Sequence, residues 1–133
     1  MERGAFFGSI HKTLEHILIC DERFIAGFTG IIKQPETEIG SYDSFDELVR
    51  QRKSVDQQIM AWAHAVSADW LNTPSSYTHN EDGGLRVVNR GFWVAHMFNH
   101  QTHHRGQITT LLSQLGLDIG STDLHGSVPN SGI

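Results

Sequence analysis

The strongest constraint on the fold is a helical repeat of apolar residues in three long segments. Apolar residues recur at spacings close to 3.6 within residues 8–28, 44–71 and 91–115. The segments are followed by Gly30, Pro74 and Gly116, which are residues that stop helices rather than continue them. The pattern predicts an all-α protein in which amphipathic helices of roughly 20–25 residues pack as a bundle.

Polar residues mark the expected helix starts and connections. We expect Ser9 to cap the first helix, and Ser44 and Glu47 to form a capping box at the start of the second. Residues 31–43 are mostly polar and contain a proline, which is typical of a connector. Residues 75–90 are compatible with a short hairpin, because two short strand-like runs flank a double glycine.

The composition limits the class of protein. The chain has 133 residues, of which 38% are hydrophobic, and this is enough for one domain with its own core. The formal net charge is −5, so no nucleic-acid partner is expected, because that affinity comes mostly from Lys and Arg. No apolar run reaches about 18 residues and no secretory signal is expected, so neither a membrane span nor export is predicted. The single cysteine, Cys20, fits a cytoplasmic protein.

The third helix carries two histidines within its apolar stripe. Steps of three and four residues trace this stripe through Trp93, Met97, His100, His104, Ile108, Leu111 and Leu115. His103 falls on a more polar face. A buried polar group without a partner costs a few kcal/mol, and a metal ion bound by His100 and His104 would supply that partner. Two core histidines that hydrogen-bond to neighbouring groups are the alternative interpretation.

A stable metal site needs a third ligand, since catalytic zinc sites usually have three protein ligands and one open position. The candidates are the carboxylates and His11, His16, His64, His79 and His96. His96 shares a helix face with His100 and His104, but these three span about 12 Å of helix axis and cannot all reach one ion. A ligand from another helix is therefore expected. Periodicity does not choose between His11 and His16.

Three further side chains of the first helix were weighed as parts of such a site. Cys20 is a possible soft ligand, but a small buried side chain is the more typical role. Asp21 and Glu15 are able to orient a ligating histidine. We instead expect them on a solvated helix face, or paired with Arg23 or Lys12.

Several motifs of other protein classes do not occur in the sequence. There is no His-Glu-x-x-His, which is the common zinc-peptidase signature, and no Glu-x-x-His of ferritin-like di-iron bundles. A phosphate-binding Gly-x-x-x-x-Gly-Lys loop and a Gly-x-Ser-x-Gly elbow are also missing.

Two blocks of sequence carry a resemblance to a known family. One is FFGSIHKTLEHIL at residues 6–18, followed by DERF at 21–24, and the other is HMFNHQTHHRGQ at residues 96–107. In these blocks the chain resembles the DinB family of metal-binding helical bundles, named after a damage-inducible protein. The resemblance covers roughly residues 3–124.

The resemblance implies an up-down-down-up four-helix bundle, often a homodimer, with a divalent metal that is commonly nickel or zinc. Carried over by motif, the three ligands are His16, His100 and His104. Only about five residues precede the first block, where family members have another helix. The bundle is therefore expected to lack its first helix in this chain, either because the start is misassigned or because a partner chain covers the missing face. A homodimer is expected, because the uncovered face would expose an apolar patch. We expect a single DinB-like domain over residues 1–133, with 124–133 as a loose tail.

Two functions are compatible with this set of ligands. One is a metal-dependent enzyme, such as a thiol S-transferase or a hydrolase, in which the ion activates a small-molecule thiol or water against an electrophile. His103 and Arg105 are candidates to face its substrate, or are ordinary surface residues, and the sequence identifies no general base. The alternative is a non-catalytic metal-binding or stress-response bundle in which the metal is structural. A role in DNA damage rests on the family name alone.

Overall fold

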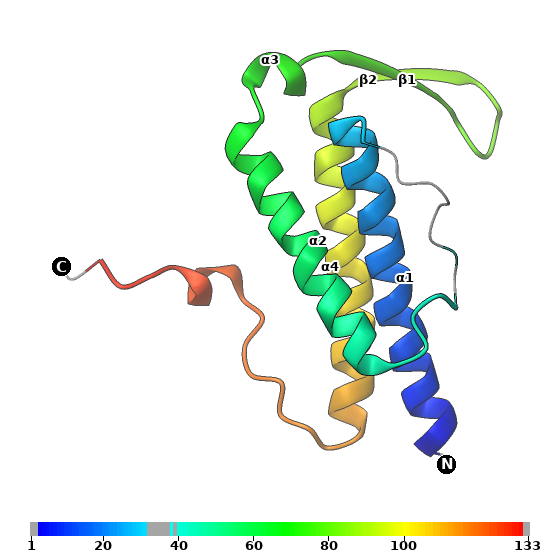
Figure 1. Cartoon of the computed structure of the whole chain (residues 1–133), viewed down its shortest axis with the longest axis vertical. Helices are drawn as coiled ribbons and strands as arrows, with labels where there is room; N and C mark the ends of the chain where they lie inside the picture. The colour runs from blue at the N-terminus through cyan, green and yellow to red at the C-terminus, as the bar shows by residue number, and fades with distance from the viewer. Residues whose placement is uncertain (1–2, 32–37, 39, 132–133) are drawn as a thin grey trace.

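Three long helices form the body of the molecule. The structure is a computed structural model that describes residues 3–31, 38 and 40–131. Helices α1 (Arg3–Thr29), α2 (Phe45–Ala65) and α4 (Arg90–Gln114) lie side by side (Figure 1). The predicted all-α bundle is confirmed, with one small sheet added to it.

The directions of the helices explain the length of the first connection. α1 and α2 run in the same direction and α4 runs in the opposite one (Figure 1). The end of α1 and the start of α2 therefore lie at opposite ends of the bundle, whereas α2 and α4 are joined at one end of the molecule. The order up, up, down matches the last three helices of an up-down-down-up bundle.

The helix ends differ in part from those predicted. α1 begins at Arg3, so Ser9 lies inside the helix and its predicted capping role is wrong. At α2, the hydroxyl of Ser44 accepts a hydrogen bond from the backbone N–H of Glu47 at 3.1 Å, as expected for a cap. α2 ends before the predicted residue 71, because the extended backbone of Val66 interrupts it. The short helix α3 (Ala68–Leu71) follows, and the hydroxyl of Ser67 caps it.

A two-stranded hairpin closes the end of the bundle at which α4 begins. Strands β1 (Pro74–Thr78) and β2 (Leu85–Asn89) pair antiparallel, with Ser76 opposite Val87. The turn contains Gly83 at a φ of +67°, a backbone conformation that favours glycine. Tyr77 packs edge-on against Trp93 at 5.1 Å between ring centres, which joins the hairpin to α4.

The core consists of two clusters along α1. The larger one contacts all three long helices and contains Leu18, Ile25, Leu48, Val55, Ile59 and Met97. The smaller one contains Ile10, Ile17 and Ile108. Burying each of these side chains stabilises the fold by about 1.5–3 kcal/mol. The clusters include Met97 and Ile108, so they hold α4 against α1 on both sides of His100 and His104 along the helix.

The end of the chain contributes little to the core. Residues 116–131 are exposed, and a 3₁₀ turn, η1 (Leu124–Ser127), is their one helical segment. Gly116 follows α4 with a φ of +79°, as predicted for a residue that ends a helix. None of the described helices combines the length and the apolar character needed to cross a membrane. The extent of the domain, and a loose tail over residues 124–133, stay predictions.

Candidate metal centre

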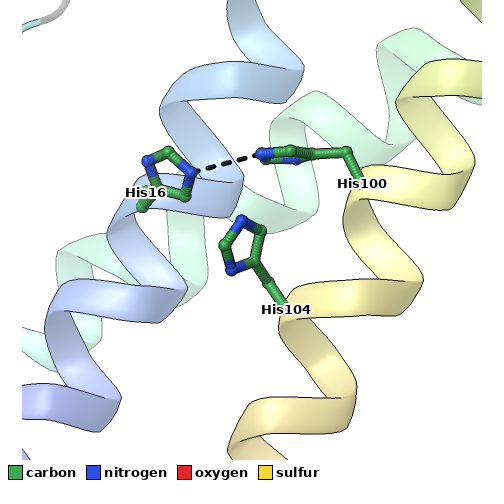
Figure 2. A group of neighbouring side chains, drawn as sticks. All are labelled: His16, His100 and His104. Carbon is green, nitrogen blue, oxygen red and sulfur yellow. Dashed lines mark hydrogen bonds between the residues drawn. The ribbon is translucent and has the colours of Figure 1, made fainter.

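Three histidines from two helices converge on one point. His16 comes from α1, and His100 and His104 come from α4 (Figure 2). The Nε2 atoms of His16 and His100 are 3.2 Å apart. One ring nitrogen of each residue lies within 4.8 Å of the other two, and within the described part of the chain this is the one such group of histidine, cysteine or carboxylate side chains.

The helices place these rings through ordinary spacing and packing. His100 and His104 are one turn apart on α4, with ring centres 4.5 Å from each other. The ring centre of His16 lies 5.1 Å from that of His100 and 4.7 Å from that of His104. His16 directly precedes Ile17 and Leu18, which are buried in the two core clusters, so the packing of α1 against α4 sets its position.

Hydrogen bonding fixes which nitrogen of His104 is free. Its Nδ1 lies 2.8 Å from the side-chain oxygen of Gln107, which only accepts hydrogen bonds. Nδ1 of His104 therefore carries the proton, and Nε2 keeps its lone pair for another partner. His100 differs, since its Nδ1 is buried and has no hydrogen-bond partner among the described residues.

The surroundings of the rings favour neutral imidazole. Burial lowers the pKa of His16, and the nearby His104 and Arg23 lower it further. Burial also lowers the pKa of His100, with further lowering by His104 and His16, while the carboxylate of Asp21 acts in the opposite direction. Neutral imidazole is the form that binds metals, so the site is prepared for a cation.

The donor set fits a divalent transition metal. Two nitrogens at 2.0–2.1 Å from a tetrahedral ion would be roughly 3.3 Å apart, close to the distance between the Nε2 atoms of His16 and His100. Three imidazoles suit zinc, copper, iron or nickel better than magnesium or calcium, which prefer oxygen ligands. All three histidines are partly exposed, so a small molecule can reach the site.

Cys20 lies beside this group but is not part of it. Its sulfur is 3.8 Å from both ring nitrogens of His16. Burial raises the pKa of the Cys20 thiol, although Arg23 acts against this effect. The sulfur of Cys20 is not among the ligand atoms that lie within 4.8 Å of one another, so the converging group consists of the three histidines alone.

The other candidate histidines lie elsewhere. His11 forms a hydrogen bond through Nε2 to the backbone oxygen of Tyr42 at 2.7 Å, so the structure brings His16 and not His11 to the α4 pair. His96 is exposed and packs against Trp93; its ring centre lies 6.5 Å from that of His100, and it does not belong to the converging group. His64 and the partly buried His79 belong to α2 and the hairpin turn.

Two carboxylates do not lie where the sequence suggested. We expected Glu15 and Asp21 on a solvated face or in pairs with Lys12 or Arg23, and this is wrong because both are buried, at 4% and 0% exposure. Glu15 accepts hydrogen bonds from the backbone N–H groups of residues 40 and 42, which tie the long connection to α1.

Asp21 connects all three long helices. Its Oδ2 accepts a hydrogen bond from Arg52 of α2 at 2.8 Å and from the side-chain amide of Gln101 of α4 at 2.9 Å. Its Oδ1 is buried without a hydrogen-bond partner in the described part of the chain. The role of Gln101 was not predicted from the sequence. The available signal was a polar residue next to His100, four residues after Met97, on the side of α4 that is buried.

The two candidate substrate-facing residues have different surroundings. Arg105 is exposed and donates a hydrogen bond to the side-chain oxygen of Gln101, which makes it part of the network around Asp21. His103 is exposed, and its ring centre lies 4.9 Å from that of His104. Neither residue belongs to the converging group.

Comparisons with known proteins identify the family of the chain. The model of the DinB family matches residues 1–128, which is almost the whole chain. No curated protein and no solved structure matches the chain.

Proposed function

The chain belongs to the DinB family, and from this premise we propose that His16, His100 and His104 bind a divalent metal ion, nickel or zinc. We further propose that the protein is a metal-dependent enzyme that acts as a thiol S-transferase or as a hydrolase. The observation that supports this most is the convergence of three imidazoles, from distant parts of the chain, on one partly exposed point.

The chemistry of a bound ion would be Lewis-acid activation, in which the pKa of a thiol or of water falls. The protein's own contribution is to set the tautomer of one ligand and to favour the neutral form of the other two. Gln107 fixes the proton of His104 on Nδ1, and burial keeps protons away from His16 and His100. No side chain beside the three rings is assigned as a general base.

A structural metal is the second candidate function. It requires a fourth protein ligand, for which Cys20 is the nearest sulfur. Cys20 does not belong to the group of ligand atoms that lie within 4.8 Å of one another, which supports an open position for a substrate. Cobalt substitution separates the two, because a thiolate ligand adds a strong sulfur-to-metal absorption band that three histidines and a water do not give.

Metal analysis tests the proposal directly. Untagged protein should carry about one nickel or zinc ion per chain by plasma mass spectrometry, and His100→Ala and His104→Ala should lose it. His103→Ala is the matched control, since it alters a neighbouring exposed histidine and should keep the metal. Absence of metal after incubation with both salts would refute the proposal, and so would equal losses in all three variants.

The proposal extends to the setting of the protein. We propose a cytoplasmic homodimer whose partners are small-molecule thiols or electrophiles rather than nucleic acid. The net charge of −5 and the single thiol support this. The large apolar side chains of Phe45 and Met60, which are 60% and 62% exposed on α2, support a contact between copies.

A further inference from the structure

A second polar feature lies at the hairpin end of the bundle, outside the three histidines. A pocket of about 220 Å³ is lined by residues from the end of α1, the helix α3, strand β1 and the start of α4. Figure 1 shows these elements at the hairpin end of the bundle. Its walls are four aromatic rings, a glycine, a serine and two arginines: Phe24, Phe28, Trp70, Trp93, Gly27, Ser75, Arg23 and Arg90. Among the residues that the structure describes, no carboxylate lines this pocket.

The two arginines lack the partners that arginines normally have. Within the residues that the structure describes, neither Arg23 nor Arg90 takes part in an ion pair, and neither guanidinium donates a hydrogen bond. Of the other described arginines, Arg52, Arg86 and Arg105 bond to acidic or amide side chains, whereas Arg50 is unpaired but is exposed on α2 and does not line the pocket. Two unpaired guanidinium groups in one pocket of an acidic protein indicate a binding site for an anion.

The pocket is also arranged to hold one of these groups in place. Cζ of Arg90 lies 5.2 Å from the centre of the Trp70 ring, a distance at which cation–π attraction is effective. Trp70 in turn packs edge-on against Phe28 at 5.6 Å. Stacking orients a guanidinium while leaving its N–H groups free, so Arg90 is oriented to bind an oxyanion.

The pocket shares a wall with the metal centre. The ring centre of Phe24 lies 6.4 Å from that of His100. Arg23 follows His16 by seven residues on α1, and Trp93 precedes His100 by seven on the oppositely directed α4, so these two residues lie about 10 Å along the bundle from the histidines. A single elongated ligand is able to occupy both positions.

We infer that this pocket binds the anionic end of the substrate: an organic molecule with an apolar body and a carboxylate or phosphate group at Arg23 and Arg90. The other end of the molecule, about 10 Å away, carries the group that reacts at the histidines. This last step rests on the proposed function, whereas the anion site does not, because the arginines and aromatic rings are present whether or not a metal binds.

The anion site is tested on protein treated with a chelator. The probe is 3-phenylpropionate, followed by the fluorescence of Trp70 and Trp93. The neutral analogue 3-phenylpropanol should bind at least about tenfold more weakly than the acid. Arg23→Gln and Arg90→Gln should each weaken the binding of 3-phenylpropionate by about tenfold. Arg50→Gln, at an exposed position of α2, is the control and should bind as wild type does. 2-Phenylethylphosphonate decides between carboxylate and phosphate.

Equal binding of the acid and the alcohol, unaffected by either arginine substitution, would overturn the inference. Arg90→Lys keeps the charge and guards against misfolding of the Gln variant; it should retain part of the affinity. A second arm uses nickel-loaded protein and 8-mercaptooctanoate, whose thiol and carboxylate ends are far apart. If the chelated protein binds 3-phenylpropionate but nickel adds nothing to the binding of the thiol, the anion site stands and the proposed metal function fails.

Discussion

Removal of the Asp21 carboxylate should be among the most damaging single changes to this fold. The side chain is fully buried, and its Oδ2 is bonded to both Arg52 and Gln101. Asp21→Ala leaves the buried amide of Gln101 unpaired and removes the buried one of the two carboxylate partners of Arg52. Breaking a buried ion pair by deleting one member costs about 3–5 kcal/mol. Because the Arg52 side chain is 26% exposed, we expect the lower end, about 3 kcal/mol.

The same arginine offers a matched control. Arg52 also pairs with Asp56, whose side chain is 56% exposed. Asp56→Ala removes a carboxylate of the same type from the same guanidinium, but at a solvated position, and should cost about 0–1 kcal/mol. Asp21→Asn keeps the shape and one acceptor oxygen while losing the charge, so its cost should fall between, at about 1–2 kcal/mol.

Urea unfolding of chelator-treated protein measures these differences without a contribution from metal. With a slope near 2 kcal/mol/M, Asp21→Ala should lower the midpoint by about 1.5 M, and Asp56→Ala should hardly move it. A loss below about 1 kcal/mol for Asp21→Ala would refute the reasoning, because the carboxylate would then contribute no more than a surface pair. Equal losses in both Ala variants would do the same.

Three further predictions concern the metal centre and the assembly. The lowered pKa values of His16 and His100 mean that the folded chain binds fewer protons than the unfolded chain just below pH 6.5. The stability that comes from keeping His16 and His100 neutral is therefore complete above that pH, and it is lost as the pH falls through their lowered folded-state pKa values. Urea midpoints should drop in this pH range, and they should drop less in a variant with both histidines replaced by Gln. Gln107→Ala should weaken metal binding by about tenfold in a competition titration, because the proton of His104 loses its acceptor, and unchanged affinity would contradict the role given to Gln107. Phe45→Asp should shift sedimentation from dimer towards monomer, and a wild-type monomer would exclude the dimer.

The helices were predictable from the sequence because their signals are local. The 3.6-residue repeat, the Ser44 cap and the glycines after α1 and α4 act within a few residues of where they occur. The two errors in helix bounds are local as well. α1 begins at Arg3, before the predicted cap at Ser9, and the extended backbone of Val66 interrupts the second helix. The apolar periodicity marks neither the earlier start nor a single extended residue.

The metal centre was only half predictable from the residues themselves. His100 and His104 stand one turn apart on one helix, so their proximity follows from spacing. The choice of His16 over His11 depends on the rotation of α1 against α4, which the periodicity of a broad apolar face does not determine. The family resemblance supplied that choice, and the structure places the ring of His16 beside the pair, while His11 is bonded to residue 42.

The burial of Glu15 and Asp21 was not predicted, because an acidic residue is expected to be exposed unless its buried partners are known. The partners of Asp21 are 31 and 80 residues away, on two other helices. One of them, Gln101, is next to His100 in the chain, and the negative charge of Asp21 is felt at His100 itself. The network that ties α1, α2 and α4 together thus surrounds a proposed metal ligand. A change at Asp21 should consequently affect both folding and metal affinity, whereas a change at Gln107 should affect affinity alone.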